Sequence, residues 1–266
     1  MEALKYTCQL LTFKSIKSNI PKGKASCVLF EFNNRFFAFS NAHVLADGLA
    51  PKAQFLIENG KSGSIGGTFM TSSLPESNKR EDDLMDLAVV LLNDNSVELL
   101  KQSGRKFLQI GDIKTGYIQK ESDIFLIAGY PASRTKTPVK RGGVEIRSLP
   151  FLLFTRPSQN SEDRYKGDWH YFAAYSRRTL RKSNTTGIVV GPNPAGLSGS
   201  GFWLISMDEG GLLRSKLVGI LSVYSRTRSI FVATKIDFFV DIIRQHFDHT
   251  IPNFGREAIL RFRRSK

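Results

Sequence analysis

Short apolar runs separated by turn residues dominate the chain. Two runs, CVLFEF at 27–32 and RFFAFS at 35–40, flank Asn33-Asn34, a pair that favours the type I′ turn of a tight β-hairpin. We expect further strands at 54–57, 64–70, 87–92, 123–128, 187–190, 201–205, 216–223 and 229–236. So many short strands in 266 residues indicate an all-β sandwich or barrel.

One helix is predicted near the end of the sequence. Apolar residues repeat there at the spacing of one helix face, over roughly residues 236–248: Phe238, Phe239, Ile242, Ile243 and Phe247. Asp237 is the candidate N-cap. The stretch 131–185 breaks the rhythm of strands, and a loop of that length is typically functional or disordered.

The two halves of the sequence differ in charge. Residues 1–130 contain 15 Lys and Arg against 14 Asp and Glu, a net of +1, and residues 131–266 contain 23 against 10, a net of +13. This asymmetry indicates either a solvated basic surface or a polyanion contact through the second half. No aromatic-interleaved nucleic-acid motif accompanies the charge.

Cysteine usage and hydropathy narrow the class of protein. Cys8 and Cys27 form no disulfide framework and match no zinc spacing, and no apolar run is long enough for a membrane helix. The first residues, MEALKYTCQLLTFKSIKSN, lack the basic and apolar regions of a secretory signal. We therefore expect a cytoplasmic protein with no membrane partner, no cofactor and no metal.

Two candidate catalytic residues stand at the ends of strands. His43 follows an apolar strand in FFAFSNAHVLADG, and Asp86 opens the apolar run DLAVVLL. A carboxylate anchored in this way orients an imidazole and stabilises its protonated form. The alternatives are a partly buried structural histidine and a strand-terminal cap. Asp82 and Asp83 compete with Asp86, but they lie in KREDD, which is typical of a solvated loop.

The other three histidines have simpler interpretations. His170 lies in the aromatic sequence WHYF, where we expect it to pack against its neighbours. His246 and His249 follow the predicted helix in a polar sequence, so we expect them at the surface.

The candidate nucleophile lies in a glycine-rich stretch. Residues 191–201 read GPNPAGLSGSG, with Ser198 between Leu197 and Gly199. A nucleophilic serine needs N–H donors aimed at the developing oxyanion, and glycine permits the backbone that provides them. Because residue 200 is serine, G-x-S-x-G does not fit around Ser198, and the order His, Asp, Ser also excludes an α/β-hydrolase. A Gly/Ser-rich turn is the alternative.

Together these segments resemble the chymotrypsin-like (trypsin-like) serine peptidases, and most of all the short bacterial, cytoplasmic-type trypsin-like peptidase domains. The likeness covers most of residues 20–250 and rests on SNAHVL, DLAVV, IAGYP, GLSGSGFW and LVGILSVY, in the family's order. It implies an all-β fold, a double six-stranded antiparallel β-barrel with a C-terminal helix. The barrels would occupy 1–112 and 113–250, with a basic insertion at 131–185 and a basic tail at 251–266.

The resemblance implies a serine endopeptidase that forms an acyl-enzyme. His43 is then the general base, Asp86 its orienting partner and Ser198 the nucleophile. The amides of Gly196 and Ser198 would form the oxyanion hole, and the Ser222 hydroxyl would support the triad carboxylate.

The resemblance also implies the substrate-binding residues: Pro192 at the base of the pocket, Ser222, Val223 and Tyr224 on its edge, and Phe231 on the opposite wall. Residues 222–224 would pair with the substrate backbone as an added strand.

Charge and size limit the side chain that this pocket accepts. Residues 186–207 and 211–236 contain no Asp or Glu, so cleavage after Lys or Arg is not expected. The bulk of Tyr224 favours small or medium apolar side chains. The alternative is an acidic side chain paired with Arg226 and Arg228.

A second hypothesis is a module of the same fold that has lost turnover and holds a polyanion or an acidic protein. The expected partner is therefore a protein or peptide substrate, or a polyanion bound at 131–185 and 256–266. The sequence leaves the oligomeric state open.

Overall fold

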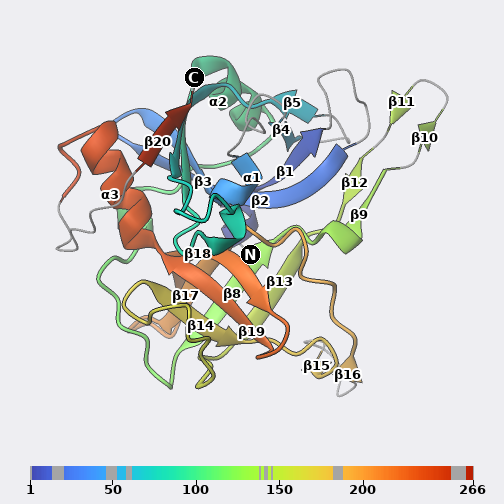
Figure 1. Ribbon diagram of the computed structural model, residues 1–266, viewed down its shortest axis with the longest axis vertical. Helices are drawn as coiled ribbons and strands as arrows, with labels where there is room; N and C mark the ends of the chain where they lie inside the picture. Colours follow the sequence, from blue (N-terminus) through green and yellow to red (C-terminus); the bar gives the residue numbers. More distant parts are fainter. Residues whose placement is uncertain are drawn as a thin grey trace.

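Antiparallel pairing builds two sheets in the computed structural model, which describes residues 2–13, 21–45, 53–57, 62–137, 139–140, 143–144, 146–181, 188–252 and 262–265. One sheet takes its strands mainly from the first third of the chain, and the other takes them from residues 124–235 (Figure 1). Each sheet is curled into a half-barrel. The predicted all-β architecture of two antiparallel barrels is confirmed.

The first sheet has the strand order β20-β6-β7-β3-β2-β1-β4-β5 in the described part of the chain. Its strands are β1 (Thr7–Phe13), β2 (Pro21–Phe32), β3 (Arg35–Ser40), β4 (Ala53–Leu56), β5 (Ser62–Ser64), β6 (Gly67–Ser72), β7 (Ala88–Leu92) and β20 (Phe262–Ser265).

The predicted hairpin between β2 and β3 is confirmed. Asn33 and Asn34 have φ values of 48° and 58°, the left-handed conformation that a type I′ turn needs at both positions. The predicted strand at 64–70 is instead divided between β5 and β6, and β1 was not predicted. β20 pairs with β6, so the described part of the basic tail lies on the first sheet and not on the second.

The second sheet has the order β13-β8-β17-β18-β19-β14. Its strands are β8 (Ile124–Gly129), β13 (Phe151–Thr155), β14 (His170–Ala174), β17 (Gly201–Met207), β18 (Leu213–Ser225) and β19 (Ile230–Lys235). Both edge strands, β13 and β14, lie within 131–185. The prediction that this stretch breaks the strand rhythm is therefore wrong there: FLLFT and HYFAA pair with β8 and β19 along their full lengths.

Three short ribbons complete the described strands. They are β9 (Thr135–Lys136) with β12 (Arg147–Ser148), β10 (Val139–Lys140) with β11 (Gly143–Val144), and β15 (Leu180–Arg181) with β16 (Ile188–Val189). The β10–β11 ribbon lies well away from both sheets in Figure 1.

The described helices are few and short. They are α1 (Ala42–Leu45), α2 (Asp94–Gln102) and α3 (Ile236–His246), with 3-10 turns at Glu2–Tyr6, Arg80–Asp82, Ile110–Asp112 and Ala132–Arg134. The predicted C-terminal helix is confirmed as α3, but its N-cap is Lys235 and not Asp237. Asp237 lies in the first turn, where its carboxylate accepts a hydrogen bond from the Gly116 amide at 2.6 Å. No described helix has the length and apolarity to cross a membrane.

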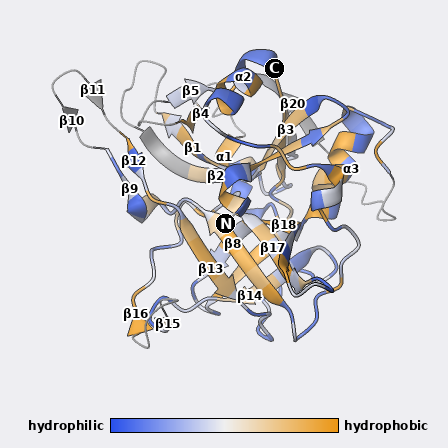
Figure 2. Ribbon diagram, turned by 180° about the vertical axis from the view of Figure 1, so that it is seen from behind, coloured by the Kyte–Doolittle hydropathy of each residue, from blue (hydrophilic) through white to orange (hydrophobic). Residues whose placement is uncertain are grey.

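Each sheet packs around its own cluster of buried apolar residues, and a third cluster lies between the two sheets. Phe55 and Leu29 lie in the first sheet's cluster, and Phe202 lies in that of the second. The joining cluster combines Phe39 of β3 with Phe239 of α3, whose ring centroids are 5.4 Å apart, and with β17 and β18. Hydrophobic residues accordingly concentrate on the strands of the second sheet in Figure 2. Helix α3 therefore helps to fix one sheet against the other, which any site between them requires.

Candidate active site

His43 and Asp86 form a directly hydrogen-bonded pair. His43 lies on α1, immediately after β3, and its Nδ1 is 2.6 Å from Asp86 Oδ2. The His43 amide donates to the other carboxylate oxygen, Oδ1, at 2.9 Å. The His43 side chain is 41% exposed, whereas that of Asp86 is 11% exposed. The carboxylate is thus shielded from water while part of the imidazole remains accessible.

Electrostatics favour a proton on the imidazole. Burial lowers the pKa of His43, but the hydrogen bond that His43 donates to Asp86 and the negative charge of Asp86 outweigh burial, so the pKa is raised above its ordinary value. Burial also raises the pKa of the Asp86 carboxyl, and its contacts with His43 offset only part of that effect. His43 therefore takes up a proton more readily than a free imidazole, as a general base must.

The loop that carries Asp86 is held by side chains from both sheets. Asp86 has a φ of 47°, a left-handed value that is uncommon outside glycine. The carbonyls of residues 84–86 lie, in order, 2.8 Å from His170 Nε2, 3.0 Å from Thr234 Oγ1 and 3.0 Å from Asn41 Nδ2. Such a conformation persists where surrounding contacts determine it, and these three contacts do so.

Asp83 supports the same loop and does not lie in a solvated segment, contrary to the prediction. Its side chain is only 6% exposed. One oxygen accepts the amides of Met85 at 3.2 Å and Asp86 at 3.0 Å, and the other is bound by Arg80 at 2.9 Å and by the Ser72 hydroxyl. Asp83 therefore buttresses Asp86 and does not compete with it for the histidine.

The Ser198 loop, residues 194–200, is docked on the first sheet through Ser26 of β2. The Ser26 amide donates to the Ser198 carbonyl at 2.8 Å, and its hydroxyl donates to the Gly196 carbonyl at 3.1 Å. The Ser26 carbonyl accepts the Ser40 hydroxyl at 2.9 Å, at the end of the strand that leads to His43. One buried residue thus links the serine loop to the strand that positions the histidine.

Two amides of this loop have no hydrogen-bond acceptor among the described residues: those of Gly196 and Ser198. The neighbouring amides at positions 195, 197, 199 and 200 are all bonded. Gly196 has a φ of 91°, and a Cβ there would lie 2.5 Å from the backbone nitrogen of Ala132, so the position requires glycine. Because paired amides are the rule in folded chains, these two donors, one on each side of the bonded Leu197 amide, are candidates for binding a ligand.

The Ser198 hydroxyl donates to the Ser222 carbonyl at 3.4 Å. Within the described residues it makes no hydrogen bond to His43. The structure therefore brings the serine loop beside the His43 strand but does not form the serine–histidine bond, which is often long without substrate.

Ser222 occupies a β-bulge. The register of β18 against β19 shifts between Leu221 and Val223, and bulges of this kind are common beside active sites. Its hydroxyl lies 2.7 Å from Thr234 Oγ1 and 3.4 Å from Asn41 Nδ2, and among the described contacts it makes no hydrogen bond to Asp86. The expected direct support of the carboxylate is corrected: the link runs through Asn41, which binds the Asp86 carbonyl.

Aromatic packing corrects two of the predicted substrate contacts. Phe231 is 0% exposed and stacks on Tyr175, with ring centroids 4.4 Å apart. Pro192 is buried, and its carbonyl accepts the Tyr175 hydroxyl at 2.7 Å. Tyr175 thus fills the space where the apolar pocket was expected. Val223 is exposed and Tyr224 is partly exposed, so both remain open to a ligand.

Sequence reasoning missed four buried polar residues that organise the site: Ser26, Ser40, Asn41 and Thr234. All are 0% exposed and lie within or beside apolar runs. Buried polar groups need partners, so a polar residue in an apolar strand was the available signal. Their partners lie far away in the sequence and were not visible from it.

The described residues contain no cluster of three or more His, Cys, Asp or Glu side chains that would hold a metal ion. Cys8 and Cys27 are buried free thiols that face each other across β1 and β2.

Several solved structures share this architecture. An inactivated protease paralogue from the scabies mite matches with a TM-score of 0.53 and 13% identity, over 94% of both chains. The fold is chymotrypsin-like. A serine endoprotease from Yersinia pestis also matches, with a TM-score of 0.49 and 14% identity over 91% of this chain. This chain covers 62%, less than two thirds, of that endoprotease.

The serine protease domain of the Sesbania mosaic virus polyprotein matches with a TM-score of 0.43 and 12% identity, over 90% of this chain and 91% of that one. No protein-family model and no curated protein sequence matches the chain. The resemblance predicted from the sequence is thus confirmed as a chymotrypsin-like fold.

Proposed function

We propose that this protein is a serine endopeptidase that hydrolyses peptide bonds through an acyl-enzyme. The observation that carries the proposal is the His43–Asp86 pair, hydrogen-bonded through both carboxylate oxygens and partly open to solvent at the imidazole. A buried carboxylate that fixes an accessible imidazole is the arrangement that activates a hydroxyl nucleophile.

In the first half of the reaction, the Ser198 hydroxyl leaves the Ser222 carbonyl and attacks the scissile carbonyl carbon. His43 takes the hydroxyl proton, and Asp86 stabilises the resulting imidazolium. The amides of Gly196 and Ser198 donate to the oxyanion. His43 then gives the proton to the leaving amine as the C–N bond breaks, and water repeats the sequence on the acyl-enzyme.

The edge of β18 supplies a place for the substrate backbone. The last residue pair between β17 and β18 is Gly201 with Ile220, so residues 223–225 have no strand partner on that side within the described chain. An extended peptide bound there as an added strand passes directly beside Ser222 and hence beside the Ser198 hydroxyl.

Active-site labelling tests this proposal. An uncharged fluorophosphonate should label Ser198, as mapped by mass spectrometry, and Ser198→Ala should remove the label. Ser200→Ala is the matched control, because Ser200 is fully buried and its hydroxyl has no partner among the described residues. A folded wild-type protein that takes up no label at pH 8 contradicts the proposal.

A module without turnover is the second candidate, and one observation favours it: the Ser198 hydroxyl is bonded to a carbonyl and not to His43. The scabies mite neighbour is described as an inactivated protease. In this case the basic residues 131–266, with a net charge of +13, bind a polyanion or an acidic protein. Heparin binding that weakens steeply with salt, without labelling of Ser198, would identify the module.

We assign either activity to the cytoplasm. The supporting observation is that Cys8 and Cys27 are free thiols although they are paired in register on adjacent strands. Thiols so placed stay reduced in a reducing compartment.

A further inference from the structure

A basic cavity of about 650 Å³ opens beside the Ser198 loop. Its lining includes Asn193 and Pro194, which precede Ser198; Tyr224 and Arg226, which follow Ser222; and Arg177 with Arg178. The lining holds three arginines and no carboxylate. The cavity is therefore strongly positive and open to a charged side chain.

The cavity is placed where the side chain of a cleaved residue would go. Tyr224 lies two residues after Ser222, whose carbonyl accepts the Ser198 hydroxyl. Pro194 accepts the amide of Leu197, the residue before Ser198, at 3.0 Å. Both of these lining segments thus lie close along the chain to residues that contact the nucleophile. A peptide added along the 223–225 edge therefore brings the side chain before its scissile bond, the P1 side chain, to this cavity.

Aromatic packing surrounds Tyr224, which lines this cavity. Tyr175 stacks on Phe231 and meets Tyr224 edge-on, with ring centroids 4.4 Å and 5.4 Å away. A substrate side chain therefore meets the packed Tyr224 ring and a rim of arginines. A Lys or Arg side chain would be repelled by that rim, and an apolar side chain would displace water from guanidinium groups without replacing their hydrogen bonds.

Arg177 is oriented in advance for a carboxylate. Its Nε donates to the Gly191 carbonyl at 3.0 Å, which fixes the guanidinium, and its terminal nitrogens make no hydrogen bond to a described residue. Two parallel N–H donors match the two oxygens of a carboxylate. Arg226 lines the same cavity, just after β18 ends at Ser225, and is exposed.

From this geometry we propose that the peptidase cleaves after Glu or Asp, with Arg177 and Arg226 as the residues that determine specificity; the proposal rests on the endopeptidase function above. It favours the acidic alternative over the apolar P1 side chain expected from the sequence. Charge-assisted hydrogen bonds of this kind correspond to roughly a tenfold to hundredfold preference for Glu over the neutral isostere Gln.

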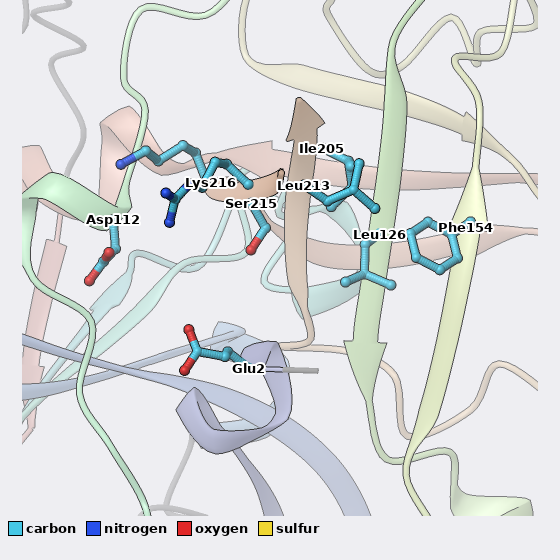
Figure 3. Close-up of a pocket in the computed structure, with 9 residues that line it drawn as sticks. Glu2, Asp112, Leu126, Phe154, Ile205, Leu213, Ser215 and Lys216 are labelled. Atoms are coloured by element: carbon cyan, nitrogen blue, oxygen red, sulfur yellow. The ribbon is translucent and has the colours of Figure 1, made fainter. Parts of the chain in front are cut away.

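A second cavity, of about 410 Å³, lacks this excess of positive charge (Figure 3). Glu2 and Asp112 lie there together with Lys216 and Arg214, so both signs of charge are present. It adjoins the start of β18, at the opposite end of the strand from Tyr224.

The test compares kcat/KM for peptides that differ only in a P1 residue of Glu, Gln, Leu or Lys. We expect Glu to exceed Gln at least tenfold. Arg177→Gln and Arg226→Gln should each lower the Glu/Gln ratio, the double variant should bring it near one, and Arg226→Lys should keep part of it. Arg226→Glu should raise cleavage after Lys.

Arg214→Gln is the matched control, because Arg214 is an exposed arginine that pairs with Asp208 at 2.8 Å on the other cavity. It should leave the Glu/Gln ratio unchanged. A Glu/Gln ratio within twofold of one, or faster cleavage after Leu or Lys, overturns the specificity while leaving the endopeptidase intact. Failure to cleave any peptide, together with no fluorophosphonate label on Ser198, overturns the proposed function itself.

Discussion

The two loops that meet at the candidate site are stabilised in opposite ways. In the Asp86 loop, residues 83–86, each carbonyl from 84 to 86 meets a side-chain partner, and the last two amides donate to Asp83. In the Ser198 loop, two amides are left without an acceptor among the described residues. The first loop is built to hold one side chain still. The second keeps donors free for a ligand, which costs stability until the ligand arrives.

Removing the nucleophile gives the largest effect that the comparison predicts. Ser198→Ala should lower peptide cleavage by about 10⁶-fold, since the residual rate then comes only from binding and the oxyanion donors. Its thermal unfolding should match that of wild type, because a partly exposed hydroxyl with one long hydrogen bond contributes little. Cleavage retained by a rigorously purified Ser198→Ala protein would exclude this serine as nucleophile.

The next largest effect comes from the orienting carboxylate. Asp86→Asn should lower kcat by about 10³- to 10⁴-fold with little change in KM, because the imidazole loses its charge partner. The pKa of His43 should fall, since Asp86 is the cause that raises it. The remaining activity should therefore persist to lower pH than in wild type. Activity within twofold of wild type would mean that another group orients His43.

The wild-type pH profile sharpens the role of the pair. The reaction needs neutral His43, and the pKa of His43 is raised above its ordinary 6.5. The acid limb of kcat/KM should therefore have its midpoint above about 6.5, with a tenfold loss per pH unit below it. Initial rates from pH 5 to 9 measure it. A midpoint well below that value would show that burial dominates and that Asp86 does not charge the imidazole.

Loosening the Asp86 loop should have a smaller effect. Thr234→Val removes the hydroxyl that meets the Met85 carbonyl at 3.0 Å and Ser222 Oγ at 2.7 Å. The unpaired carbonyl should reduce stability by about 1–3 kcal/mol, and kcat should fall more than KM rises. Thr68→Val is the control, a partly buried β6 position whose hydroxyl makes no hydrogen bond within the described chain. Equal losses in both variants would refute a positioning role.

Occupying the free amides of Gly196 and Ser198 should give the smallest change, and this change should stabilise the protein instead of weakening it. A phosphonylated Ser198 places a polar phosphoryl oxygen, a strong hydrogen-bond acceptor, near the amides of Gly196 and Ser198. Two new hydrogen bonds, at about 1 kcal/mol each, should raise Tm by several degrees. Differential scanning calorimetry of labelled and unlabelled protein measures the shift. An unchanged Tm would show that these amides do not form the oxyanion hole.

The sequence predicts the fold better than it predicts the contacts that hold the site in place. The turn residues were enough to predict the β2–β3 hairpin, and the spacing of apolar residues was enough to predict helix α3, because both elements depend on local sequence. Edge strands β13 and β14 were not predicted, because the charged residues between them made the stretch 131–185 resemble a loop. Asp83 was misjudged because its partners, Arg80 and Ser72, become visible only once the loop folds over β6. Tyr175 likewise closes the apolar pocket through a contact 56 residues away in the chain, with Phe231.

The contact of Ser26 with Gly196 spans 170 residues, whereas His43 and Asp86 are only 43 apart. Chains are synthesised from the N-terminus, and contacts that close long loops form late in folding. The strands that carry His43 and Asp86 can therefore pair on the ribosome before the serine loop exists, whereas the contacts of the Asp86 loop with His170 and Thr234 form later. If the protein is the proposed peptidase, catalytic competence must then await the docking of the serine loop onto Ser26, so a growing or half-finished chain is unable to digest its neighbours.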